Sequence, residues 1–196
     1  MFEPTLLPEV QSSVVSSVLY LGVDVGSTTV KAVVLDAEGN LLFSRYRRHL
    51  SEVRSTVAGM LREVGAECPV PGGNTAAVQW RLAFSGSGSI SLAAEMEIPF
   101  VQEVIASGLY IRERIPHADV CIELGGEDAK LTFFTEGLDQ RMNETCAGGT
   151  GAFIDQMAAF IHTDAAGLDE MALNHKTVYP IASRCGVFAK QTFCPF

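Results

Sequence analysis

The first half of the chain alternates between short apolar runs and turns that contain glycine. Three strand-length runs come first: 18–25, 29–37 and 41–48. Residues 51–64 instead carry apolar side chains at helical spacing, so a helix is expected there with Ser51 as its N-cap. Another strand is expected at 77–84, ahead of the loop sequence SGSGS. Strands interleaved with helices predict an α/β fold.

The same pattern begins again in the second half. Helices are expected at 90–96, where Pro99 stops the first of them, and at 101–115. Three more strand-length runs then follow across short turns: 119–124, 129–134 and 138–143. A further helix is expected to begin near Thr150.

Two of the predicted hairpins repeat one motif. DVGSTTVK begins at Asp24 and ELGGEDAK begins at Glu123, and each has an acidic residue, a glycine two places on and a lysine seven places on. A repeat of a whole supersecondary unit indicates a duplicated architecture. The expected organisation is a leader at 1–17, a first half at 18–117 and a second half at 118–196.

The residue types at the hairpin tips suit the binding of a phosphate chain. Glycine lets a ligand approach the backbone, and consecutive amides in a tight turn form an anion-binding concavity. The expected nucleotide-binding residues are Gly26, Ser27, Thr28, Thr29, Lys31, Gly125, Gly126 and Asp128. Carboxylates of Asp24 and Glu123 at the strand ends can hold Mg²⁺ through water. Either motif alone also fits an ordinary β-hairpin, but their repetition favours a nucleotide site.

Composition and charge exclude several functions. The net charge of this 196-residue chain is -9 and no basic stripe is present, which argues against nucleic acid as a partner. No signal peptide or membrane-spanning run is expected, so a cytoplasmic location is predicted. The basic run RYRRH at 45–49 reads as a solvated strand end, or alternatively as a contact for an acidic partner.

The five cysteines form an odd set without a secretory signal, which favours reduced thiols or a metal site over disulfides. Cys146 precedes Gly-Gly-Thr-Gly and a helical pattern, where a thiolate is stabilised. It could be a nucleophile, a metal ligand or a small buried side chain. Cys121 is expected in the core, and Cys68 is expected to be incidental in a loop.

Four ordered motifs carry a resemblance to a known family. The two hairpin motifs resemble the phosphate-binding hairpins of the actin, sugar-kinase and heat-shock-chaperone ATPases. Together with MNETCAGGTGAFIDQMA and IASRCGVFAK, they resemble the BadF/BadG/BcrA/BcrD-type ATPases, the activators of 2-hydroxyacyl-CoA dehydratases and benzoyl-CoA reductases. FSGSGSISLAAEMEIPFVQEVIA is similar to the large, multi-module branch of this family.

The resemblance implies a duplicated, ribonuclease-H-like α/β fold of the actin-like ATPases, with a mixed sheet in each half. It implies that ATP and Mg²⁺ bind between the halves, with Asp24, Glu123 and Glu127 as catalytic residues. It also implies that Cys146 and Cys185 each ligate a 4Fe–4S cluster shared with a second copy, in a homodimer or a fused repeat. The implied function is ATP-driven transfer of a low-potential electron from ferredoxin or flavodoxin to an acyl-CoA dehydratase or reductase.

The sequence departs from the family pattern at two places. Glu127 stands where smaller relatives tend to carry glutamine, which puts the rate of hydrolysis in doubt. The adenosine-binding segment expected well after Cys185 is missing, so the second half is expected to be incomplete and nucleotide affinity weak. Two other functions share the hairpins: a sugar-kinase-like phosphotransferase, and a non-catalytic actin-like regulatory or interaction domain.

Overall fold

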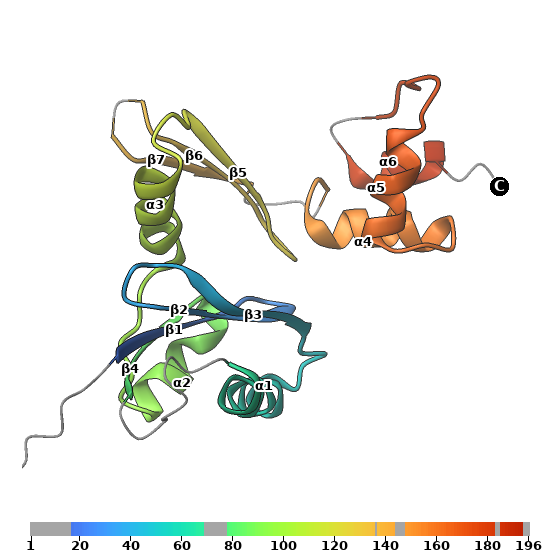
Figure 1. Cartoon of the computed structure of the whole chain (residues 1–196). Helices are drawn as coiled ribbons and strands as arrows, with labels where there is room; N and C mark the ends of the chain where they lie inside the picture. The colour runs from blue at the N-terminus through green and yellow to red at the C-terminus, as the bar shows by residue number, and fades with distance from the viewer. Residues whose placement is uncertain (1–16, 69–77, 136, 144–147, 183–184, 194–196) are drawn as a thin grey trace, which may run out of the picture.

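The computed structural model of the chain describes residues 17–68, 78–135, 137–143, 148–182 and 185–193. The polypeptide forms two α/β units, each begun by an antiparallel strand pair joined through a glycine turn. Figure 1 shows the first unit below the second, with the last three helices gathered beside the second sheet. The predicted leader at residues 1–17 lies almost wholly outside the described residues.

The first sheet is mixed, as predicted. Its strands are β1 (Ser17–Val25), β2 (Thr29–Leu35), β3 (Leu41–Arg48) and β4 (Val78–Ser85), in the order β3-β2-β1-β4. β1 is antiparallel to β2 and parallel to β4, so the register places Asp24 opposite both Lys31 and Ser85. The chemistry predicted for the first hairpin therefore lies at one end of the two central strands.

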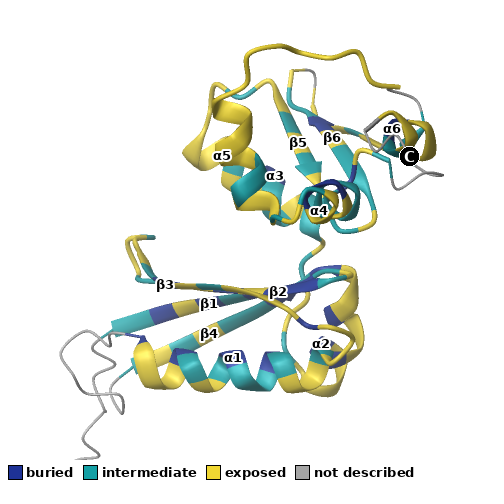
Figure 2. Cartoon of the chain, turned by 90° about the vertical axis from the view of Figure 1, so that its right-hand side faces the viewer, coloured by how far each residue is buried: buried dark blue, intermediate teal, exposed yellow. Residues whose placement is uncertain are grey.

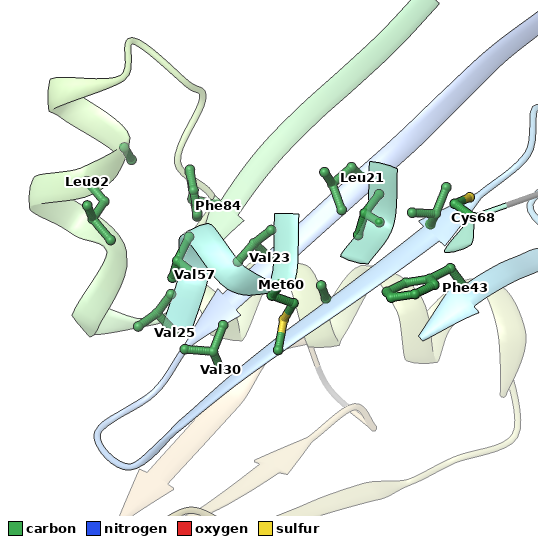
Figure 3. Close-up of a cluster of buried hydrophobic side chains, with 14 of the residues drawn as sticks. Leu21, Val23, Val25, Val30, Phe43, Val57, Met60, Cys68, Phe84 and Leu92 are labelled. Atoms are coloured by element: carbon green, nitrogen blue, oxygen red, sulfur yellow. The ribbon is translucent and has the colours of Figure 1, made fainter. Parts of the chain in front are cut away.

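Helix α1 (Val53–Glu67) packs on one face of this sheet and closes the core (Figure 3). The face predicted from helical spacing is confirmed, because Val57, Met60 and Val64 are buried. Cys68, expected to be incidental in a loop, is 8% exposed and belongs to the same core, because the helix carries it back onto the sheet.

The predicted N-cap of α1 is wrong. Glu52, not Ser51, occupies the cap position, and no side chain caps the helix there. Leu50 and Ser51 adopt positive φ angles of 47° and 69°, which delay entry into the helix. A sequence pattern does not indicate these positive φ angles, because residues other than glycine rarely adopt them.

A short helical connection leads from the first unit to the second. It contains the 3-10 turn η3 (Ser87–Ser89), α2 (Ile90–Glu95) and α3 (Glu103–Arg114). Phe84 near the end of β4 forms a parallel bridge with Phe100, which joins the segment between α2 and α3 to the first sheet. Among the described helices, none is both long and apolar enough to cross a membrane.

The second sheet is smaller and antiparallel in its described part. It consists of β5 (Val120–Leu124), β6 (Ala129–Phe133) and β7 (Asp139–Met142), in the order β5-β6-β7. β4 has no counterpart beside β5 among the described residues, and Val120, Ile122 and Leu124 of β5 are exposed. In Figure 2 the buried residues gather mainly in the first unit. The helices after the second sheet are α4 (Gly151–Phe160), α5 (Ala165–Leu173) and α6 (Gly186–Phe193).

Candidate functional site

The two repeated turns, residues 26–29 (the first turn) and 125–128 (the second turn), have the same backbone geometry. Gly26 N–H donates to Thr29 O at 2.9 Å, and Gly125 N–H donates to Asp128 O at 2.8 Å. The turns also face each other, since a Cβ added at Gly126 would lie 2.6 Å from Thr28 Oγ1. The sequence repeat thus corresponds to a repeat in three dimensions.

A cleft of about 1300 Å³ opens around the two turns and is lined by both units. It contains every predicted phosphate, magnesium and hydrolysis residue: Asp24, Gly26, Ser27, Thr28, Thr29, Lys31, Glu123, Gly125, Gly126, Glu127 and Asp128. The structure brings these residues together, while their individual roles stay predictions.

The carboxylates in the cleft are unevenly paired. Asp24 forms an ion pair with Lys31 at 2.9 Å across the first hairpin. Oε2 of Glu123 is buried, and no hydrogen-bond partner for it occurs among the described residues. Burial raises the pKa of Glu123. The negative charges of Asp24 and Asp128 raise it further, whereas the positive charge of Lys31 lowers it. A hard cation would supply the missing positive charge here.

This carboxylate arrangement fits Mg²⁺ that keeps water ligands. Over the described ranges, no set of three or more histidine, cysteine, aspartate or glutamate side chains is arranged to hold a metal directly. Mg²⁺ is commonly bound through one or two carboxylates, several waters and substrate phosphates. Asp24 and Glu123 meet that requirement, with the phosphates supplied by the ligand.

Lys130, the counterpart of Lys31 in the repeat, has a different partner. Its ammonium contacts Glu103 at the start of α3 and lies 3.5 Å from Asp128. Its side chain is 12% exposed, and burial lowers the pKa of Lys130. The ion pair between Lys130 and Glu103 therefore joins the second hairpin to helix α3. Glu103 could not be predicted from the sequence, because a pairing between a helix start and a distant strand leaves no periodic signal.

Replacing Glu123 with glutamine is expected to stabilise the chain at neutral pH by about 1 kcal/mol, because the amide removes the charge of a carboxylate whose Oε2 is buried with no hydrogen-bond partner among the described residues. The folded-state pKa of Glu123 is raised above its ordinary value of 4.5. The favourable contribution of the protonated acid is therefore present below the unfolded pKa and is lost as pH rises through the folded pKa.

Urea unfolding of both proteins, followed by circular dichroism, measures this effect. The advantage of Glu123→Gln should be present near pH 8 and vanish near pH 4. A variant less stable than the wild type near pH 8 would show that ionised Glu123 is well compensated in the fold.

Helix α4 begins on the second turn. Gly151 N–H donates to Gly125 O at 2.7 Å, and Ala152 N–H donates to Gly126 O at 3.2 Å. A Cβ added at Gly151 would lie 2.9 Å from Gly125 O, so only glycine permits this approach. The first amides of α4 are thus bound to the turn predicted to hold phosphate. Cys146, which precedes this helix, lies outside the described residues.

Cys185 stands at the start of α6, where its carbonyl accepts from Ala189 N–H at 2.9 Å. It is half-buried, and no disulfide involves it. A Cβ added at the adjacent Gly186 would lie 3.3 Å from Gly148 Cα and 3.4 Å from the Phe153 ring. The beginnings of α4 and α6 therefore meet, and helix N-termini stabilise negative charge. This meeting point fits an anionic group held by thiolates.

The basic run at 45–49 is a strand end as predicted, with Tyr46, Arg47 and Arg48 exposed, but its arginines are not free. Its arginines are paired within the chain: Arg45 with Glu63 (3.1 Å) and Glu67, Arg47 with Glu63 (2.7 Å), and Arg48 with Asp155. His49 is only 7% exposed. The pair Arg48–Asp155 joins the end of β3 to helix α4 and so connects the two units.

Comparison with known proteins agrees with this architecture. The profile of the BadF/BadG/BcrA/BcrD ATPase family matches residues 21–195. The chain belongs to this family. The family profile thus agrees with the resemblance of the sequence motifs and with the repeated turns of the structure.

Relatives within the BadF/BadG/BcrA/BcrD ATPase family include dehydratase activators. The activator of lactoyl-CoA dehydratase from Anaerotignum propionicum is 32% identical over 177 residues, which cover 87% of this chain and 64% of the relative. The chain thus spans less than two thirds of the length of this relative.

Two solved structures have the same fold. Component A of (R)-2-hydroxyglutaryl-CoA dehydratase from Acidaminococcus fermentans superposes with a TM-score of 0.75 at 22% identity, covering 90% of this chain and 67% of that one. The activator of 2-hydroxyisocaproyl-CoA dehydratase from Clostridium difficile, solved with bound ADPNP, gives 0.69 at 26% identity, covering 89% and 63%. The predicted actin-like α/β fold class is confirmed.

Proposed function

We propose that this chain is an ATP-driven activator module that delivers a low-potential electron to a 2-hydroxyacyl-CoA dehydratase or a related acyl-CoA reductase. The observation that carries the proposal is the pair of hydrogen bonds from Gly151 and Ala152 to the second turn. They join the predicted phosphate site to the helix that follows Cys146. The activator named among the relatives supports the same reaction class.

ATP and Mg²⁺ are proposed to bind in the cleft between the units. The remaining amides of the two turns and the hydroxyls of Ser27 and Thr28 bind the phosphates, because both turns line the same cleft. Asp24 and Glu123 hold Mg²⁺ through water, and exposed Glu127 orients the attacking water. The relative solved with bound ADPNP supports nucleotide binding by this fold.

A 4Fe–4S cluster is the second proposed cofactor. Cys146 and Cys185 would supply two of the four thiolates that such a cluster ordinarily takes. A second copy of the module, in a homodimer or a fused repeat, would supply the others. When bound, the cluster provides one-electron chemistry at low potential, loaded by ferredoxin or flavodoxin in the cytoplasm. The residues beside Cys185 suit it, because two helix beginnings meet there.

Contacts within the chain give a route by which bound ATP acts on the start of helix α4, which follows Cys146. Phosphates that draw the amides of the second turn toward them move Gly125 and Gly126, whose carbonyls hold the start of α4. The ion pair Arg48–Asp155 transmits movement of the first unit to the same helix. ATP shifts this equilibrium only as far as it binds one arrangement better than the other.

Anaerobic iron–sulfur reconstitution followed by visible and EPR spectroscopy tests the proposal. The full chain should take up a cluster, and Cys146→Ala combined with Cys185→Ala should abolish it. Cys121→Ala is the matched control, because Cys121 is a half-buried thiol on β5 outside both cysteine motifs.

Failure of the full chain to take up a cluster, or a cluster that persists in the double variant, would contradict the activator role. ATP hydrolysis without any cluster would favour the phosphotransferase reading. A chain that shows no ATP hydrolysis and takes up no cluster would favour a non-catalytic domain.

A further inference from the structure

The end of β3 meets the first turn through His49. Its backbone N–H donates to Thr28 O at 3.1 Å, and its ring atom Nε2 lies 3.2 Å from Gly26 O. The side chain is buried, with 7% of its surface exposed. Both carbonyls belong to the turn whose amides are expected to bind phosphate. His49 therefore contacts the back of this turn, not the ligand side.

The other ring nitrogen of His49 fixes its tautomer. Ser51 N–H donates to Nδ1 at 3.1 Å, so Nδ1 must present a lone pair. The proton of the neutral ring is then on Nε2, which can donate it to Gly26 O. This assignment follows from the hydrogen-bond network on both sides of the ring. A backbone amide thus determines that His49 acts as a donor toward the first turn.

The backbone after His49 adopts an unfavourable conformation that makes this contact possible. Leu50 and Ser51 have positive φ angles of 47° and 69°. Leu50 is 81% exposed, so burial of its side chain does not compensate for the conformation. The turn instead brings Ser51 N–H onto Nδ1 and Glu52 N–H onto His49 O at 2.7 Å. Strained residues of this kind persist where surrounding contacts determine them, often near functional sites.

We propose that His49 is a positioning residue that holds the first turn in its phosphate-binding shape through an Nε2–H···O bond to Gly26. The bond engages the carbonyl of Gly26, whose own N–H donates to Thr29 O across the turn, and so restrains the shape of the turn. Arg48, the preceding residue, binds Asp155 on α4. The consequence for nucleotide binding rests on the proposed function, whereas the hydrogen-bond geometry does not.

Two substitutions of similar size separate positioning from packing. In His49→Gln the amide nitrogen reaches about as far as Nε2 and can still donate to Gly26 O. In His49→Asn the side chain reaches only as far as Nδ1 and loses that donor. The KM for Mg·ATP hydrolysis should rise about 5- to 10-fold in His49→Asn, as expected for one lost hydrogen bond. It should stay within about 2-fold of wild type in His49→Gln, with kcat changed less in both.

Two NMR measurements need no activity. Long-range ¹H–¹⁵N spectra should show His49 with its proton on Nε2. Hydrogen exchange of the Gly26 amide, which donates to Thr29 O, should be faster in His49→Asn and unchanged in His49→Gln. The signal of His49 is assigned by its loss in His49→Gln.

A proton on Nδ1, or equal Gly26 exchange in the two variants, would overturn the positioning role. Equal KM values in the two variants would overturn it as well. A wild-type chain that hydrolyses no ATP would instead contradict the proposed function, and the tautomer and exchange results would still decide the role of His49.

Discussion

Replacing Asp24 with asparagine is expected to lower kcat for ATP hydrolysis by about 100-fold or more, the usual cost of removing a group that stabilises transition-state charge. Asp24 is the penultimate residue of β1, beside the first turn, and lines the cleft together with Glu123. Asparagine keeps the shape of the side chain and removes the charge that would hold Mg²⁺ through water. It also leaves Lys31, now paired to Asp24 at 2.9 Å, without its carboxylate.

Steady-state ATPase assays at saturating Mg²⁺ provide the measurement. Asp36→Asn is the matched control, because Asp36 follows β2 of the same sheet and its carboxylate accepts hydrogen bonds from Glu38 and Asn40 in its own turn. The control should keep nearly full activity. Asp24→Asn with more than about a third of wild-type kcat would remove Asp24 from the magnesium site and favour a carboxylate of the second hairpin.

Replacing Gly86 with alanine is expected to lower the free energy of unfolding of the first unit by about 3 kcal/mol, because two independent penalties combine. Gly86 has φ +82°, where a side chain is strained. Its added Cβ would lie 2.3 Å from Val25 O and 2.5 Å from Asp24 Oδ1. Relief requires backbone movement of β1, since Val25 O cannot rotate away like a flexible side chain.

Urea unfolding followed by the fluorescence of Trp80 measures this effect. Trp80 is the single tryptophan and packs against the core of the first unit. Gly59→Ala is the matched control, because nothing lies within 4 Å of its added Cβ inside α1. The control should stabilise the unit by about 0.5–1 kcal/mol. A Gly86→Ala variant as stable as the wild type would mean that the SGSGS loop can withdraw from β1.

The sequence was most informative where the chemistry repeats along it. The acid–x–glycine motifs predicted both turns and the turn residues that line the cleft, because a turn requires particular residue types at neighbouring positions. The strands of both units were also predictable, since apolar runs bounded by turn residues are a local signal. The fold class followed from the order of these elements.

Contacts between distant segments could not be predicted in the same way. Arg48 and Asp155 are 107 residues apart, and nothing local to either marks the other. The exposure of the RYRRH run was predictable, but the ion pairs of its arginines were not, because charge alone does not identify a partner. His49 depends on backbone angles at Leu50 and Ser51 that their side chains disfavour. Such contacts are determined by tertiary packing and not by local preference.

The uneven distribution of the core has a consequence for cooperativity. The contiguous cluster of buried apolar side chains lies entirely within residues 19–93, whereas β5 exposes Val120, Ile122 and Leu124. Unfolding therefore need not be a single all-or-none transition, and one melting temperature would not characterise the chain. Segments that open at low free-energy cost are those that move during function. The second unit, which carries Cys185, has fewer buried apolar side chains among the described residues than the first. It is therefore expected to open at a lower free-energy cost, and Cys185 is expected to move with it while the first unit stays folded.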